Sequence, residues 1–250
     1  MKRQKISAIF LRLAVYLASI ITVSALLFVV GYILVKGVPH LSFKLFEWKY
    51  TTDNLSLLPA LLNTVLMTAL SLLIAVPLGV FAAIYLVEYA KRGSRLVRVI
   101  RMNAETLAGI PSIVYGLFGM LFFVTALKLG FSMLSGALTI SIMILPVILR
   151  TSEEALMSVP DSFREGSFGL GAGRLRTVFR VVLPDAIPGI LAGVILGVGR
   201  TVGETAALLY TAGTSSDTVS GIMDSARTLS VHMYALSQEG LYSIRPMPLL

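Results

Sequence analysis

An arginine and a glutamate stand four residues apart inside an apolar stretch of the sequence. Arg200 and Glu204 fall within residues 187–210, which otherwise have the length and composition of a membrane-spanning helix. A charge at the centre of such a helix costs at least about 2.5–3.5 kcal/mol, so it usually faces a cavity or a charged partner. Residues four apart share one face of a helix. We therefore predict an Arg200–Glu204 ion pair slightly outward of the bilayer centre, because Arg200 is the fourteenth residue of the expected span.

Three glycines extend the face that carries this pair. Gly189, Gly193 and Gly197 fall in the same arc of the helix as Arg200 and Glu204. Small residues in a row let two membrane helices approach closely, so the pair is expected to face protein and not lipid. Two interpretations are open at this point. The pair is either a structural link between helices, or part of an anion path in which the guanidinium binds the oxygens of phosphate or sulfate in a bidentate manner.

A second surface of small and hydroxylated residues lies earlier in the chain. Ser112, Tyr115, Gly116 and Gly119 share one face of an expected helix that follows Pro111. A seam for close helix packing is the favoured interpretation. Contact between a substrate and Ser112 or Tyr115 is the alternative.

The elements that position these residues are expected to cross a membrane. Of the 250 residues, 56% are hydrophobic and 14% are charged, and the mean hydropathy is +0.86. A soluble domain carries about 25% charged residues, so this chain has too few polar side chains to cover a globule in water. Five stretches have the ~20 apolar residues that a spanning helix requires: 13–35, 58–87, 106–127, 129–149 and 187–210. The predicted fold is all-α, a polytopic membrane protein in which residues 1–250 form one transmembrane domain.

Basic residues indicate which side of the membrane each loop faces. Fourteen Lys and Arg residues lie in the amino-terminal segment and in the second-to-third and fourth-to-fifth connections, against four in the two other loops. Because cytoplasmic loops carry an excess of Lys and Arg, we expect a cytoplasmic amino terminus and an extracytoplasmic segment over 211–250. This distribution explains the net charge of +8 without a nucleic-acid partner, and membrane lipids are the expected surroundings.

Several kinds of chemistry have no residues to support them. The sequence has no cysteine, which excludes disulfides and thiol chemistry, and His40 and His232 are far apart, so we expect no metal site and no cofactor. It contains no nucleophile–base constellation and no G-x-x-x-x-G-K-[ST] phosphate loop. We therefore expect a protein that is not an enzyme, and any ATP that drives it must be hydrolysed on another polypeptide.

The connection 150–185 has the pattern of two short helices around a glycine turn. Ser162-x-x-Glu165 matches a capping box that begins a helix, and glycines at 169, 171 and 173 are expected to end it. A second amphipathic stretch, 174–183, is expected to end at Pro184. Such a loop either rests on lipid headgroups or docks on a partner protein. Five acidic residues offset its five arginines, which favours a protein partner.

One run in this connection resembles the EAA loop of ABC importer permeases, whose pattern is E-A-A-x3-G-x9-I-x-L-P. The matching run is Glu165-Gly166-Ser167-x3-Gly171-x9-Val181-x-Leu183-Pro184. It departs from the pattern by small or β-branched replacements at 166, 167 and 181. The resemblance implies a type I ABC importer permease fold and a cytoplasmic coupling loop over 150–185 that docks on the ATP-hydrolysing subunit. The residues implied in coupling are Ser162, Glu165, Gly166, Ser167, Gly171, Leu183 and Pro184.

Three further motifs resemble those of the permease subunits of phosphate-specific ABC importers, and the run 206–213, A-A-L-L-Y-T-A-G, looks more like the A-type subunit (PstA) than its C-type paralogue. Residues 199–205 read G-R-T-V-G-E-T, residues 108–116 read A-G-I-P-S-I-V-Y-G, and residues 153–160 read E-E-A-L-M-S-V-P. The resemblance implies ATP-driven import of inorganic phosphate across a prokaryotic cytoplasmic membrane by alternating access. Its implied partners are a C-type paralogous permease, an ATPase dimer and an extracytoplasmic phosphate-binding protein. The implied substrate pathway consists of Arg200, Glu204, Thr201, Ser112 and Tyr115.

The chain departs from that family at its carboxyl end. Members of the family have six transmembrane helices, and this sequence offers five. The tail from Ile244 reads I-R-P-M-P-L-L instead of leading into a last helix, and we hypothesise a frameshift near Ser243. Two alternatives to phosphate import are open on sequence alone: a permease for another oxyanion such as sulfate or molybdate, and a truncated membrane scaffold that does not transport.

Overall fold

A computed structural model describes residues 2–40, 43–48, 50–51, 56–91 and 93–239, and every regular element in these ranges is helical. The chain divides into two compact units, Met1–Glu47 and Trp48–Leu250. The expected all-α architecture is therefore confirmed for the described residues. The predicted tail at 244–250 and the hypothesised frameshift near Ser243 lie outside them.

The first unit is dominated by one long helix. Helix α1 (Lys2–Gly37) is followed by two short 3-10 turns, η1 (Val38–His40) and η2 (Phe43–Phe46). The segment Leu11–Gly37 is long and apolar enough to cross a membrane, and its large apolar side chains are exposed. The predicted span 13–35 lies within this helix.

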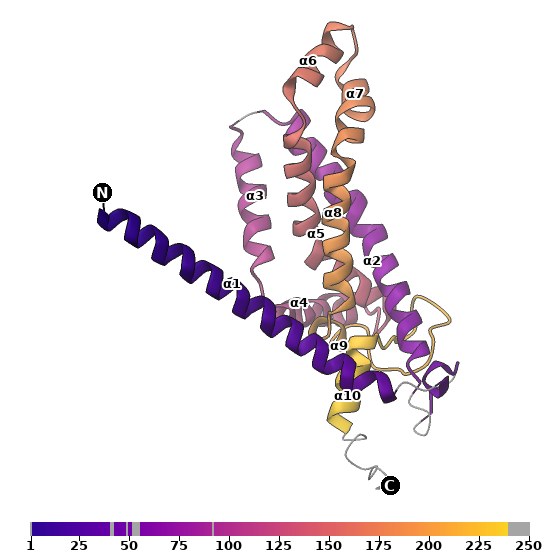
Figure 1. Ribbon diagram of the computed structural model, residues 1–250. Coiled ribbons are helices and arrows are strands. Elements are labelled where there is room, and N and C mark those ends of the chain that lie inside the picture. The colour runs from indigo at the N-terminus through magenta and orange to yellow at the C-terminus, as the bar shows by residue number, and fades with distance from the viewer. Residues whose placement is uncertain (1, 41–42, 49, 52–55, 92, 240–250) are drawn as a thin grey trace. The chain divides into compact units, whose positions relative to one another are not determined.

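The second unit contains the remaining helices (Figure 1). In chain order they are α2 (Leu58–Ile84) with the π-helical turn η3 (Tyr85–Tyr89), α3 (Arg95–Ala108), α4 (Ser112–Gly119) with the π-helical segment η4 (Met120–Ala126), α5 (Met133–Ser158), α6 (Asp161–Gly169), α7 (Arg174–Thr177), the π-helical turn η5 (Val178–Val182), α8 (Leu183–Val202), α9 (Ala206–Leu209) and α10 (Leu229–Glu239).

Helix α5 forms the centre of this unit, and α2 and α8 pack against it. The contacts are close because glycines stand at the crossings. A Cβ atom built on Gly79 of α2 would lie 2.8 Å from the Ile148 side chain, and one on Gly189 of α8 would lie 2.6 Å from that of Ala155. The apolar residues between these helices are fully buried, among them Met67, Ile140 and Ile144.

The third predicted span, 106–127, is wrong as a single straight helix. Helices α3 and α4 with η4 are both apolar enough to contribute to a span, but they meet at an angle of 102°. The break falls at Gly109–Pro111, where Pro111 has φ −57° and ψ 140°. Proline lacks an N–H for the helix ladder and disfavours helical backbone at the residue before it. The described residues thus hold four helices that suffice to cross a membrane, or five if this bent pair counts as one.

The fourth and fifth predicted spans are shifted in the structure. Helix α5 begins later than 129 because the Ser132 side chain caps it, accepting a hydrogen bond of 3.2 Å from the Ser135 N–H. It runs on to Ser158, where Pro160 forces extended backbone at Val159. The fifth predicted span, 187–210, is wrong at its far end: α8 ends at Val202 and a turn separates it from α9.

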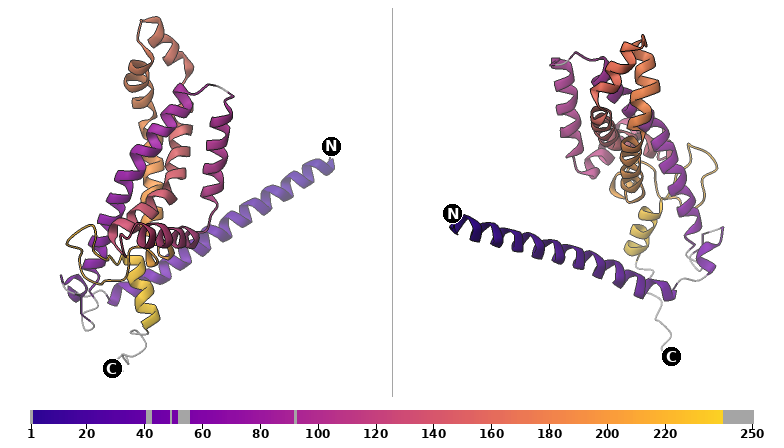
Figure 2. Two further views of the ribbon diagram at one scale, coloured as in Figure 1. Left: turned by 180° about the vertical axis from the view of Figure 1, so that it is seen from behind. Right: turned by 45° about the horizontal axis from the view of Figure 1, so that its top comes forward.

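The two short helices predicted between the fourth and fifth spans are present as α6 and α7. They lie at one end of the second unit, and α9 and α10 lie at the opposite end (Figures 1 and 2). Gly171 has φ +81°, the left-handed conformation expected of a glycine that ends a helix.

Two details of this loop correct the sequence prediction. The capping box is not formed, because α6 already begins at Asp161 and Ser162 lies inside its first turn, with no side-chain cap. Pro184 does not end a helix, because η5 carries the chain from α7 into α8 and Pro184 occupies the first turn of α8.

Candidate functional site

Arg200 lies in the last turn of α8, at the end that points away from α6 and α7 (Figure 1). Its side chain is partly buried. Within the described part of the chain, its guanidinium forms no hydrogen bond and no ion pair. All five N–H donors of an arginine are therefore available to a ligand at this position.

The predicted Arg200–Glu204 ion pair is not present in the structure. The prediction assumed an unbroken helix through residue 204, but α8 ends at Val202, so the four-residue spacing no longer places the two side chains on one face. The Glu204 carboxylate instead accepts a hydrogen bond of 3.0 Å from the Ala207 N–H. A carboxylate at this position satisfies an N–H that the short helix α9 leaves without a partner.

Glu204 is the anchor of the turn between α8 and α9. It is 8% exposed. Its backbone N–H donates to the Thr201 carbonyl at 3.2 Å, and its carbonyl accepts from the Ser230 hydroxyl of α10 at 2.5 Å. Three hydrogen bonds from Glu204 thus hold the ends of α8, α9 and α10 together. This structural role was not predicted from the sequence.

Thr201 is buried and turned into the protein. Its hydroxyl donates to the Gly197 carbonyl one turn earlier in α8 at 2.9 Å. In this conformation Thr201 has no hydroxyl proton left for a substrate. Its contribution is to the packing of the helix end that carries Arg200.

Tyr115 and Ser112, the pathway residues expected on the preceding span, both lie in α4. Tyr115 is 5% exposed, and its hydroxyl donates to the Leu107 carbonyl at 2.7 Å. This bond crosses the break between α3 and α4 and satisfies a carbonyl that the end of α3 leaves free. Helix α4 packs against α9 and α5. Ser112 is partly buried at the first residue of α4.

The glycines of α4 form a packing seam, the interpretation favoured from the sequence. A Cβ atom on Gly116 would lie 2.8 Å from the Ala207 Cα of α9. One on Gly119 would lie 2.7 Å from the Thr211 side chain. The seam packs α4 tightly against α9, directly after the turn that Glu204 anchors.

The glycine face of α8 also packs as expected. A Cβ atom on Gly193 would collide with Thr151 of α5, and one on Gly197 would lie 3.5 Å from Leu72 of α2. This face therefore contacts protein, in agreement with the sequence.

A buried asparagine that the sequence did not single out holds the segment after α9. The Asn63 amide of α2 donates to the Asp217 and Arg227 carbonyls at 3.0 and 3.3 Å. Its oxygen accepts from the Val219 N–H at 3.2 Å. A lone asparagine in an apolar run is the only signal that sequence offers for this contact, since its partners lie more than 150 residues away.

The loop of α6 and α7 presents an exposed apolar surface. Phe163, Phe168 and Leu175 are exposed, and Leu170 is 92% exposed at the turn. Of the predicted coupling residues, Glu165 and Gly166 are exposed and Ser167 is partly buried. The hydroxyls of Ser167 and Thr177 lie 2.8 Å apart and join the two short helices.

A sequence profile described as "Binding-protein-dependent transport system inner membrane component" matches residues 75–237 of the chain. The chain belongs to this family. The match covers α5 to α9 completely, including the α6–α7 loop and the Arg200 region. The chain is thus a multi-pass inner-membrane component of a transport system that depends on a binding protein.

Individual relatives are similar over most of the chain. The probable ABC transporter permease protein YqgI of Bacillus subtilis is 35% identical over 84% of this chain and 76% of its own length. The phosphate transport system permease protein PstA 1 of Mycobacterium tuberculosis is 41% identical over 62% of this chain and 51% of its own length. The phosphate transport system permease protein PstA of Pasteurella multocida is 37% identical over 72% of this chain and 64% of its own length. The chain thus spans about half to three quarters of these proteins.

Proposed function

We propose that this chain is the A-type permease subunit of an ATP-driven importer of inorganic phosphate. The observation that carries the proposal is family membership together with two relatives, 37% and 41% identical, that are named as phosphate transport permeases. The substrate is an oxyanion, and the partly buried Arg200 offers donors that match one. ATP hydrolysis belongs to a separate subunit in this proposal, and the chain itself catalyses no reaction.

The proposal assigns partners and an orientation to the ends of the second unit. The α6–α7 loop faces the cytoplasm and docks on the ATPase dimer, and its exposed apolar side chains suit such a contact. Helices α9 and α10 then lie toward the extracytoplasmic side, where a phosphate-binding protein delivers the anion. The amino terminus is cytoplasmic, and a C-type paralogue supplies the other half of the pathway.

Arg200 is the residue that we place on the phosphate path. From Leu183 to Arg200, α8 rises by about 26 Å at 1.5 Å per residue, nearly the ~30 Å of a hydrocarbon core. We therefore place Arg200 toward the extracytoplasmic end of the pathway. Its charge is not neutralised by Glu204, so it can attract phosphate and bind two oxygens through its planar fork. Ser112, Tyr115, Thr201 and Glu204 support it from the surrounding turns.

The experiment that tests this function is uptake of radiolabelled phosphate by cells in which this chain is the sole A-type permease. Arg200→Ala and Arg200→Lys are compared with the parent chain and with Arg98→Ala, a control that removes an exposed arginine of α3. Membrane abundance of every variant is measured in parallel. We expect uptake to fall strongly in Arg200→Ala and in part in Arg200→Lys, since lysine keeps the charge but not the fork.

Competition between labelled phosphate and unlabelled anions identifies the substrate. Excess unlabelled phosphate should abolish uptake, and sulfate or molybdate should leave it unchanged. Inhibition by sulfate or molybdate would instead assign another oxyanion. Absence of uptake at normal abundance would favour a scaffold, and full activity of Arg200→Ala would remove Arg200 from the path.

A further inference from the structure

Arg164 of α6 uses every donor of its guanidinium inside the protein. Its Nε and one terminal nitrogen donate to the Glu88 carboxylate at 3.1 and 2.8 Å. The same terminal nitrogen donates to the Leu156 carbonyl at 2.8 Å, and the other donates to the Val159 carbonyl at 2.7 Å and to Asp161 at 3.3 Å. An arginine has five N–H donors, and all five are engaged here.

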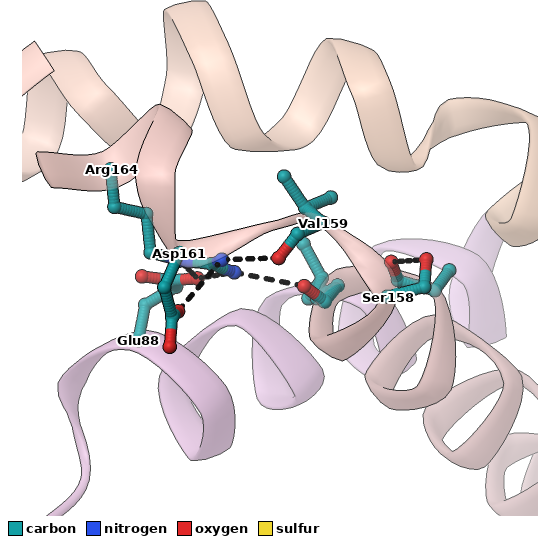
Figure 3. A network of polar contacts seen from close by, with 7 residues as sticks. Glu88, Ser158, Val159, Asp161 and Arg164 are labelled. Atoms are coloured by element: carbon teal, nitrogen blue, oxygen red, sulfur yellow. Dashed lines mark hydrogen bonds and ion pairs between the residues drawn. The ribbon is translucent and has the colours of Figure 1, made fainter. Parts of the chain in front are cut away.

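These bonds join three elements at one point, as Figure 3 shows. Arg164 belongs to α6, Glu88 lies in the turn η3 that ends α2, and the Leu156 and Val159 carbonyls lie at the end of α5. The last carbonyls of a helix have no partner within it, and a cation there also interacts favourably with the helix dipole. Arg164 thus caps α5 while it binds α2.

The Arg164–Glu88 pair is shielded from solvent on both sides. The side chains of Arg164 and Glu88 are 13% and 8% exposed. The Arg150–Glu154 pair on α5, by contrast, has side chains that are 62% and 60% exposed. Exposed pairs contribute little, whereas removing one partner of a buried pair leaves an uncompensated charge.

The Arg164–Glu88 cluster lies where the α6–α7 loop meets the helices that form the core of the unit. Helix α6 is peripheral: none of its residues is fully buried, and apart from the Arg164 contacts it packs on α7 and η5. Helices α2 and α5 are packed against each other along their length and bear the core of the unit. The Arg164 guanidinium joins α6 directly to η3 and to the end of α5, so a force on α6 reaches that core through it as well as along α7 and α8.

We propose that Arg164 is a positioning residue that transmits movement of the α6–α7 loop to α2 and α5. Its partner Glu88 holds the guanidinium in place, and the carbonyls of Leu156 and Val159 receive the displacement. This inference rests on the proposed function, because it assigns the loop to the ATPase. It goes further in naming the contact through which ATP-driven movement enters the transmembrane helices.

The test uses the complete transporter in proteoliposomes: this chain with its paralogous permease, the ATPase dimer and the phosphate-loaded binding protein. ATP hydrolysis and phosphate uptake are measured on the same preparation, and the result is the number of phosphate ions moved per ATP hydrolysed. The variants are Arg164→Gln, Arg164→Lys, Glu88→Gln and the double change at 88 and 164. Arg150→Gln is the matched control, an arginine of α5 whose ion pair is exposed.

We expect ATP hydrolysis to continue in Arg164→Gln while phosphate moved per ATP falls by about two- to thirtyfold, the range in which residues between coupled sites act. Arg164→Lys should resemble Arg164→Gln, since three donors without a planar fork cannot reach all the acceptors. Glu88→Gln should lower the ratio less, and the double variant should be no worse than Arg164→Gln alone. Arg150→Gln should match the parent chain.

An unchanged ratio in assembled Arg164→Gln overturns the inference. If Arg164→Gln does not assemble, Glu88→Gln decides the question, because glutamine keeps the shape and an acceptor oxygen: a parent-like ratio in that variant also overturns it. A proportional loss of hydrolysis and uptake would assign Arg164 to ATPase docking instead. Failure of the proposed function is recognised separately, since the unmodified transporter would then move no phosphate.

Discussion

The contact between Gly193 of α8 and Thr151 of α5 provides the sharpest test of how the helices pack. A Cβ atom at position 193 would lie 2.8 Å from the Thr151 Cβ and closer still to its hydroxyl oxygen. Since the Thr151 Cβ is fixed to its backbone, Gly193→Ala must push α8 away from α5. Overpacking of this kind typically costs about 1–3 kcal/mol.

A second glycine of α8 serves as a control, because it distinguishes the effect of the steric collision from the effect of alanine on helix propensity. Replacing glycine by alanine inside a helix stabilises it by up to about 1 kcal/mol. Gly199 is also in α8, and a Cβ atom there would meet no heavy atom within 4 Å. Gly199→Ala should therefore gain from helix propensity without a collision. The free energy of unfolding of Gly193→Ala should then be lower than that of Gly199→Ala by about 1–3 kcal/mol.

The assay is reversible unfolding of the purified permease in mixed detergent micelles, with SDS as denaturant and circular dichroism as the readout. Thr151→Ala in the Gly193→Ala background should recover part of the loss, and a double-mutant cycle isolates that recovery. The reasoning would be refuted if Gly193→Ala were as stable as Gly199→Ala. A loss that Thr151→Ala leaves unchanged would place the strain at another contact.

Three further changes test polar contacts of the second unit in the same assay. Arg101→Gln should destabilise the protein by about 1–3 kcal/mol, because it leaves the Glu153 carboxylate, whose side chain is 8% exposed, without its ion pair. Tyr115→Phe should cost about 1 kcal/mol through the lost bond to the Leu107 carbonyl; a neutral effect would show that packing alone holds the bend. Asn63→Ala should expose the segment 214–228 to proteases under native conditions, and equal cleavage in the parent chain would argue against its anchoring role.

Features that depend on neighbours along the chain were predictable from the sequence. The helical content follows from long apolar stretches, and the glycine face of α8 follows from a spacing that any straight helix obeys. The turn between α6 and α7 follows from Gly171, whose positive φ suits a residue without a Cβ atom. The sequence predicts these features correctly because they need no contact with distant residues.

The helix ends around the site were not predictable in the same way. Hydropathy continues smoothly past residue 202, yet the chain turns there, and the turn is held by a bond from Ser230 to the Glu204 carbonyl 26 residues away. The predicted Arg200–Glu204 ion pair is wrong for this reason. At Pro111 the opposite holds: the residue that breaks the third span is visible in the sequence, although the run around it is apolar enough for a straight span.

The Arg164–Glu88 cluster illustrates a third case, in which each residue looks ordinary by itself. An arginine in a loop and a glutamate near the end of a span are both compatible with solvent exposure, and 76 residues separate them. Only the convergence of α2, α5 and α6 makes the pair buried and gives it five bonds. A buried charge pair between distant segments therefore emerges from the fold and not from the local sequence.

The continuous helix from α7 to α8 connects the α6–α7 loop to the turn that carries Arg200. It extends from Arg174 to Val202, 29 residues, or about 43 Å at 1.5 Å per residue. Along the way its glycine face is locked against α5, the helix that Arg164 caps at its other end. Glycines at 189 and 193 let α8 approach α5 closely, with no space left for a Cβ atom at either position. In the function we propose, a displacement of α8 would reach its last turn, where Arg200 lies and where Glu204 anchors α9. An ATP-driven change at the α6–α7 loop would then alter the surroundings of the Arg200 guanidinium.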